Sequence, residues 1–122
     1  MNILADTSVW IEWLIAGHHA ADAGHYLKQS SSLFVPSIVQ YELFKWVLRE
    51  RDETTALEVV ALTEDCTVVP LDSKLAIFAA RISLQHKLAM ADAIVYATSL
   101  LNKATLITRD KHFAGLAGVK LI

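Results

Sequence analysis

The sequence is poor in the residues that build linkers, disulfide scaffolds and membrane spans. Its 122 residues include one cysteine (Cys66), two prolines and four glycines. A single thiol forms no internal disulfide, so we expect a protein of the reducing cytoplasm. Although 54% of the residues are hydrophobic, no run reaches about 18 apolar residues, so no transmembrane helix is expected. The N-terminus lacks a basic segment followed by an apolar one, so no signal peptide is expected.

The sequence also lacks repeats, low-complexity tracts and any segment with the composition of a linker. We therefore expect one domain over residues 1–122, long enough for a single hydrophobic core. The net charge of −2 gives no global signature of nucleic-acid binding. If a metal neutralised four of the 13 acidic residues, 9 would remain against 11 basic residues. A phosphate-backbone substrate is therefore not excluded, but its attraction would have to be local.

Short apolar runs separated by helical patterns predict an α/β fold. Strands are expected at residues 2–6, 33–35, 67–71, 104–108 and 119–122. Helices are expected at residues 8–15, 19–30, 37–50, 53–64, 73–86 and 90–103. Ser37 and Gln40 have the spacing of a capping box, and Asp72 or Ser73 can cap the helix that follows them. Short strands without alternation indicate a three-layer α/β/α fold with a mostly parallel central sheet flanked by helices.

Two carboxylates are expected where strands of this sheet end. The stretch ILADTSVW delivers Asp6 directly after an apolar run, and Asp110 stands two residues beyond the predicted strand ATLIT. Ligands of open parallel sheets bind beyond the carboxyl ends of the strands. A buried Asp is costly unless it is hydrogen-bonded, paired with a cation or bound to a metal. Taken alone, Asp6 could instead cap a helix, and Asp110 could be a turn residue.

Two further acids interrupt apolar helices. Glu42 lies in IVQYELFKWVL, and Asp92 lies in the first turn of the helix MADAIVYATSLL. Each has a simpler alternative, since Glu42 could form an exposed ion pair with Lys45 or Arg49. The helix macrodipole alone would favour Asp92.

Together the four acids Asp6, Glu42, Asp92 and Asp110 are expected to converge on one cleft. Carboxylates about 4 Å apart repel by roughly 4 kcal/mol per pair at an effective dielectric near 20, so the cluster requires a cation. Hard oxygen donors favour Mg²⁺ or Mn²⁺ over Zn²⁺.

Hydroxyls and histidines give weaker signals. Ser8 and Thr108 each lie two residues from an acid and could orient it or hold a water, or could simply form turns. Zinc is not expected, because the group His18, His19 and His25 lacks a cysteine or a second well-spaced pair. His86 and His112 have the pattern of surface or helix-end residues.

In combination, four motifs resemble those of PIN-domain proteins, and most closely the VapC-type toxins of bacterial and archaeal toxin–antitoxin pairs. They are ADTSVWIEWL, the isolated Glu42, ADAIVYATSL and TLITRDKHF. The resemblance covers the whole chain and implies a PIN-like fold with a Mg²⁺- or Mn²⁺-dependent endoribonuclease activity. By motif position, the acidic catalytic and metal site would be Asp6, Glu42, Asp92 and Asp110, supported by Ser8 and Thr108. RNA would be hydrolysed by an activated water, without a covalent enzyme intermediate.

The resemblance also implies partners. The helix SVWIEWLI is apolar almost all round, so one of its sides, with Trp10 and Trp13, is expected to face a second copy or a protein antitoxin. Neighbouring helices of the same chain could cover it instead. Lys45, Arg49 and Arg109 are candidates for contact with RNA or the antitoxin, or are simply solvated surface. A homodimer is expected.

Three alternatives remain open. The chain could be a PIN nuclease that processes RNA without being a toxin, or a catalytically silent PIN scaffold. A phospho-receiver module is disfavoured, because Asp72 follows a strand but Lys120, within the last strand, does not provide the lysine that such sites use. A phosphatase of the haloacid-dehalogenase kind would need D-x-D after the first strand, where the sequence has D-T-S.

Overall fold

The computed structural model describes residues 1–122 and alternates short strands with helices. The strands are β1 (Ile3–Ala5), β2 (Leu33–Pro36), β3 (Thr67–Val69), β4 (Thr105–Thr108) and β5 (Val119–Leu121). The helices are α1 (Thr7–Leu14), α2 (Ala20–Leu27), α3 (Ser37–Glu50), α4 (Glu53–Glu64), α5 (Ser73–His86) and α6 (Met90–Leu101). Two 3-10 helices, η1 (Ser30–Ser32) and η2 (Lys111–Phe113), complete the fold. Each predicted strand and helix is present, and several are shorter than predicted.

The strands form one sheet in the order β3-β2-β1-β4-β5, and every neighbouring pair is parallel. From β1 the chain adds β2 and β3 on one side of the sheet, and then β4 and β5 on the other side of β1. Such a reversal leaves a crevice beyond the carboxyl ends of the two central strands, where ligands of open α/β sheets bind. The residues that follow β1 and β4 lie at this crevice.

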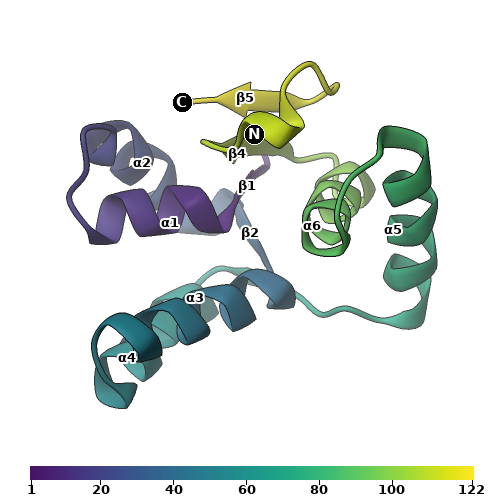
Figure 1. Cartoon of the computed structure of the whole chain (residues 1–122). Coiled ribbons are helices and arrows are strands. Elements are labelled where there is room, and N and C mark those ends of the chain that lie inside the picture. Colours follow the sequence, from purple (N-terminus) through teal and green to yellow (C-terminus); the bar gives the residue numbers. More distant parts are fainter.

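The helices make the outer two of three layers. Figure 1 shows α1 and α2 on one side of the central strands and α5 and α6 on the other. The helices α3 and α4 pack on each other, and α3 also contacts α1 and α6. This arrangement confirms the predicted α/β/α fold, with a sheet that is wholly rather than mostly parallel.

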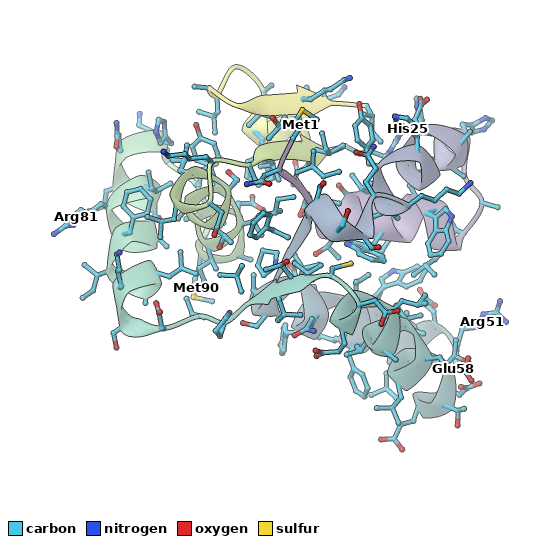
Figure 2. The ribbon with its side chains drawn as sticks, turned by 180° about the vertical axis from the view of Figure 1, so that it is seen from behind. Met1, His25, Arg51, Glu58, Arg81 and Met90 are labelled. Atoms are coloured by element: carbon cyan, nitrogen blue, oxygen red, sulfur yellow. The ribbon has the colours of Figure 1, made fainter.

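The core is densest around β1 and α6. All three residues of β1 are fully buried, since other strands flank it on both edges and helices cover both its faces. Seven consecutive residues of α6, from Ala93 to Ser99, are buried because this helix lies between the sheet and α5. Figure 2 shows the side chains that fill the space between the sheet and the helices. None of the helices combines the length and apolar character that a membrane crossing requires.

The predicted capping box of α3 is wrong. Strand β2 continues through Pro36 straight into the helix, so Ser37 is already helical and makes no cap bond. Its Oγ atom accepts a hydrogen bond from the Leu71 backbone N–H at 3.2 Å. Gln40 turns to α4 and donates to the Thr63 hydroxyl at 2.9 Å. Both side chains therefore tie α3 to neighbouring segments.

The predicted cap of α5 is confirmed, and it gives a test of the fold. The Asp72 carboxylate accepts a hydrogen bond from the Leu75 backbone N–H at 2.9 Å. We expect Asp72→Ala to lower the free energy of unfolding by about 1 kcal/mol, because the N–H loses its acceptor. Asp72→Asn keeps an acceptor and should lose much less in urea unfolding followed by circular dichroism. Equal losses in the two variants would contradict the cap.

Candidate functional site

Asp6 stands where β1 becomes α1. Its backbone N–H still donates to the Ile107 carbonyl of β4 at 3.0 Å, so the sheet pairing fixes its main chain. Its carboxylate caps α1 by accepting from the Thr7 N–H at 2.7 Å. The residue is only 6% exposed. Asp6 is therefore both a helix cap and a buried carboxylate at the crevice, and the two roles are compatible.

Two hydroxyls hold the second oxygen of this carboxylate. Thr108 Oγ1 donates to Asp6 Oδ2 at 2.8 Å, and Ser8 Oγ donates to the same oxygen at 3.1 Å. Each hydroxyl also accepts a backbone N–H from the loop after β4. Asp110 N donates to Thr108 at 2.9 Å, and Arg109 N donates to Ser8 at 3.1 Å. The hydroxyls thereby connect Asp6 to the segment that carries Asp110.

Glu42 approaches Asp6 from α3. The Thr7 hydroxyl donates to Glu42 Oε1 at 2.6 Å, and Thr7 directly follows Asp6 in the chain. The alternative of an ion pair within α3 is wrong: Arg49 pairs with Glu50 at 3.8 Å, and no salt bridge joins Glu42 to Lys45. The Glu42 side chain is half-buried beside the start of α1.

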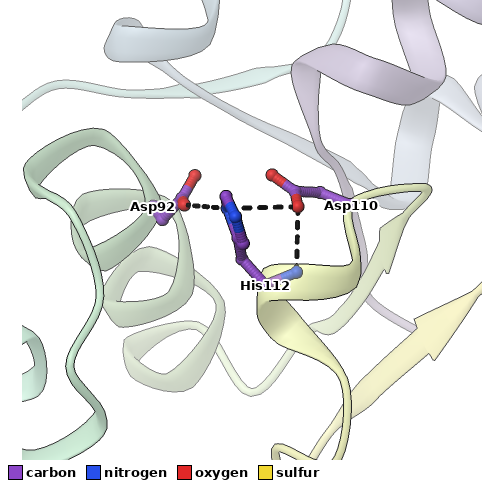
Figure 3. A group of neighbouring side chains, drawn as sticks. All are labelled: Asp92, Asp110 and His112. Carbon is purple, nitrogen blue, oxygen red and sulfur yellow. Dashed lines mark hydrogen bonds and ion pairs between the residues drawn. The ribbon is translucent and has the colours of Figure 1, made fainter.

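Asp92 and Asp110 form a second group, with His112 between them. Asp92 lies in the first turn of α6, and Asp110 caps η2 by accepting from the His112 N–H at 2.9 Å. Figure 3 shows the imidazole facing both carboxylates, with Nδ1 3.4 Å from Asp92 Oδ2 and 3.3 Å from Asp110 Oδ1. One donor atom from each of the three residues lies within 4.8 Å of the other two.

The four predicted acids are thus arranged as two adjoining pairs. The group of Asp92, Asp110 and His112 does not include Asp6 or Glu42. Thr108 joins the two pairs, because its hydroxyl donates to Asp6 and accepts from the backbone of Asp110.

The two tryptophans of α1 differ in their surroundings. Trp10 is 3% exposed and belongs to the hydrophobic core, so its predicted partner-facing position is wrong. The reason is that α1 packs against α2, α3 and β4 of the same chain. Trp13 is 37% exposed and lines a hollow of about 240 Å³ between α1, α2 and α4.

These features agree with the result of the family comparison, in which the PIN-domain model matches residues 3–119. The chain belongs to the PIN-domain family. Among curated proteins, the sequence comparison finds no match. Among solved structures, the toxin–antitoxin complex from Klebsiella pneumoniae is similar at a TM-score of 0.80 and 24% identity, covering 98% of this chain and 96% of that one.

Two other solved structures show the same fold. The DNA-bound VapBC from Salmonella typhimurium has a TM-score of 0.76 at 15% identity and covers 100% of this chain and 97% of its own. VapC20 from Mycobacterium tuberculosis, described as a toxin that cleaves the sarcin-ricin loop, has a TM-score of 0.76 at 16% identity and covers 95% of both chains. The PIN domain described here is thus similar in fold to VapC-type toxins along its whole length.

Burial sets the electrostatics of this PIN domain's acidic site. The pKa of Asp6 is raised to about 6, mainly because burial removes its carboxylate from water. Hydrogen bonds from Thr108, Ser8 and Thr7 lower the pKa and the charge of Glu42 raises it, and the value includes both effects. Burial and then the neighbouring Asp110 raise the pKa of Asp92, while His112 lowers it. Each pair of acids therefore shows charge repulsion that a bound cation would relieve.

The donor set fits a hard divalent cation. Asp6 already accepts three hydrogen bonds, which leaves about one of the four acceptor positions of a carboxylate free. Asp92 and Asp110 offer further oxygens, with one imidazole nitrogen beside them. Oxygen-rich sites suit Mg²⁺ and Mn²⁺, whereas structural zinc sites use sulfur and nitrogen donors. The histidines before and within α2, namely His18, His19 and His25, are not in the group that could hold a metal.

The Arg109 side chain forms an ion pair with Glu12 of α1 and is not freely solvated. Its Nε atom lies 3.8 Å from Glu12 Oε1, and its side chain is 31% exposed. Glu12 also accepts from the His19 backbone N–H at 2.8 Å. Arg109 therefore packs on α1 and attaches the loop after β4 to the turn that follows this helix.

Sequence reasoning missed two contributors, Thr7 and His112. Thr7 follows Asp6 directly, but its bond to Glu42 spans 35 positions and has no local signature. A usable signal existed for His112, which stands two residues after Asp110. Asp side chains commonly bond the backbone two residues on, which here carries the imidazole to the acids.

The raised pKa of Asp6 predicts a stability that depends on pH. The pKa of Asp6 is about 6 in the folded protein, against the ordinary 3.8. Ionisation of Asp6 therefore destabilises the fold as the pH rises from about 4 to about 6. At full ionisation the free energy of unfolding is lower by about 3 kcal/mol. In EDTA at pH 8, Asp6→Asn should therefore be more stable than wild type, and the difference should fall to about 1 kcal/mol at pH 4.5, where most folded molecules carry a protonated Asp6. Urea unfolding at both pH values measures this.

Glu58→Gln is the matched control, since Glu58 is exposed on α4 (Figure 2). It should show no such difference. A gain for Asp6→Asn that is equal at both pH values would contradict burial of the charge as its cause.

Proposed function

We propose that this PIN domain is a Mg²⁺- or Mn²⁺-dependent endoribonuclease and the toxin of a VapBC-type toxin–antitoxin pair. One observation carries the proposal: the Thr108 hydroxyl connects two pairs of carboxylates at the ends of β1 and β4. Carboxylates concentrated at one crevice suit a divalent cation. The fold similarity to chains of toxin–antitoxin complexes supports the biological role.

In this proposal Asp6, Glu42, Asp92 and Asp110 would hold the cation. When bound, it would activate water and stabilise the charge that develops on a scissile phosphate. Ser8 and Thr108 orient Asp6 by donating to one of its oxygens. Thr7 orients Glu42 in the same way. No other side chain is needed as a nucleophile, because water is the attacking group.

RNA would be drawn to the site by local positive charge. Lys45 and Arg49 are exposed on α3 and line, with Glu42 and Thr7, a shallow hollow of about 290 Å³. Lys and Arg side chains contact phosphates irrespective of base sequence. We assign contacts with the RNA backbone to these two residues.

The antitoxin would cover the hollow beside Trp13. Leu27 and Leu62 line this hollow together with Trp10. Trp13 is 37% exposed beside these side chains, and an apolar segment of the antitoxin would cover it.

A second copy would use another surface. The outer side of α5 and the start of α6 expose the apolar side chains of Ile77, Leu84 and Met90. These residues give the proposed homodimer an apolar surface well separated from the hollow beside Trp13.

RNA cleavage tests the enzymatic part of the proposal. Purified protein should cut total tRNA or ribosomal RNA at discrete positions with Mg²⁺ or Mn²⁺, and EDTA should abolish the cuts. Asp6→Asn and Asp92→Asn should each lower cleavage by at least about 100-fold, because changes around metal ligands already cost 10- to 100-fold. Glu58→Gln should cleave as wild type does.

Cleavage that survives EDTA or both substitutions would refute the metal mechanism. A protein that binds Mn²⁺ and cuts no RNA would favour a catalytically silent scaffold. Cleavage without growth inhibition on expression would favour an RNA-processing nuclease that is not a toxin.

A further inference from the structure

The imidazole of His112 lies against two carboxylates although its side chain is largely exposed. Its side chain is 75% exposed, yet its ring faces two carboxylates from different elements of the fold. Its backbone is fixed by the bond from its N–H to Asp110 at 2.9 Å, and the next residue, Phe113, is fully buried. The short helix η2 is therefore anchored on both sides of the imidazole, which holds the ring over Asp92 and Asp110 (Figure 3).

The distances around the ring are longer than those of good ion pairs. Nδ1 lies 3.3 Å from Asp110 and 3.4 Å from Asp92, whereas charge-assisted N–H···O bonds measure about 2.7–2.9 Å. Neighbouring ligands of an octahedral ion with bonds of about 2.1 Å lie roughly 3 Å apart, and opposite ligands roughly 4.2 Å apart. The three donor atoms all lie within 4.8 Å of one another. The two contacts of Nδ1 are thus close to the spacing of neighbouring ligands, and the group can share a metal ion.

We propose that His112 is a nitrogen ligand of the divalent cation and that it biases the site toward Mn²⁺ over Mg²⁺. The proposal rests on the proposed function, which supplies the cation, and adds a ligand and a metal preference to it. Its ring makes no ion pair other than those with Asp92 and Asp110. The chemistry of the donor gives the preference, since imidazole suits transition metals, whereas Mg²⁺ is bound by oxygen ligands and retains several waters.

Pulsed EPR of the Mn²⁺-loaded protein tests the ligand directly. Electron spin echo modulation from a directly bound ¹⁴N should be present in wild type and absent in His112→Gln. The His18→Gln variant is the matched control, because His18 is exposed and makes no side-chain contact with an acid. It should retain the modulation, which excludes His18 as the source of the nitrogen.

Metal titrations test the preference. We expect His112→Gln to weaken Mn²⁺ binding by about 10-fold, at the lower end of the effects seen when metal-site residues are removed. Its Mg²⁺ affinity should change by less than about 2-fold, since the carboxylates remain. Isothermal titration of wild type and both variants with each ion measures how far each substitution changes the affinity for Mn²⁺ and for Mg²⁺.

The outcomes separate this inference from the proposed function. Mn²⁺ bound without ¹⁴N modulation would overturn the role of His112 as a ligand, and equal weakening of both ions would overturn the metal preference. Either result would leave the carboxylate site intact. Modulation that persists in His112→Gln would also overturn the role of His112 as a ligand. If wild type bound neither ion, the proposed metal-dependent function would fail and the role of His112 with it.

Discussion

The hydrogen bond from Thr108 to Asp6 is the interaction on which the rest of the site depends. It joins the ends of β1 and β4, the two strands between which the order of the sheet reverses. Because Thr108 also accepts the Asp110 N–H, one hydroxyl positions acids from both pairs. Burial makes the ionised Asp6 costly, and the same burial makes it a strong attractor for a cation. The fold therefore holds in place a charge that it does not itself neutralise.

The sequence was sufficient to predict the layers of the fold and the strands and helices that carry the four acids, but not their division into two pairs. Five short apolar runs separated by helical patterns have few arrangements other than a parallel sheet covered on both faces. The ends of those runs then located Asp6 and Asp110 at the crevice. Glu42 and Asp92 were found because a carboxylate in an otherwise apolar helix is an exception to the local pattern. These patterns are local in the sequence, and the helices and strands that they predict are present in the fold.

The remaining features depend on contacts between distant segments. Thr7 meets Glu42 only because α3 passes the start of α1. The burial of Trp10 required knowing that three elements of the same chain surround α1. Ser37 matched a capping pattern, but β2 runs directly into α3 and leaves no cap position for it. His112 was read as a surface residue, which its exposure supports, while its direction is set by η2.

The central claim is that the two carboxylate pairs together hold one divalent-ion site. Anomalous diffraction from crystals grown with Mn²⁺ tests it most directly. We expect a Mn²⁺ peak that contacts Asp6 as well as Asp92 and Asp110, and loss of that peak in Asp92→Asn. An empty crevice at saturating Mn²⁺, or an ion bound only at residues remote from these acids, would contradict the account.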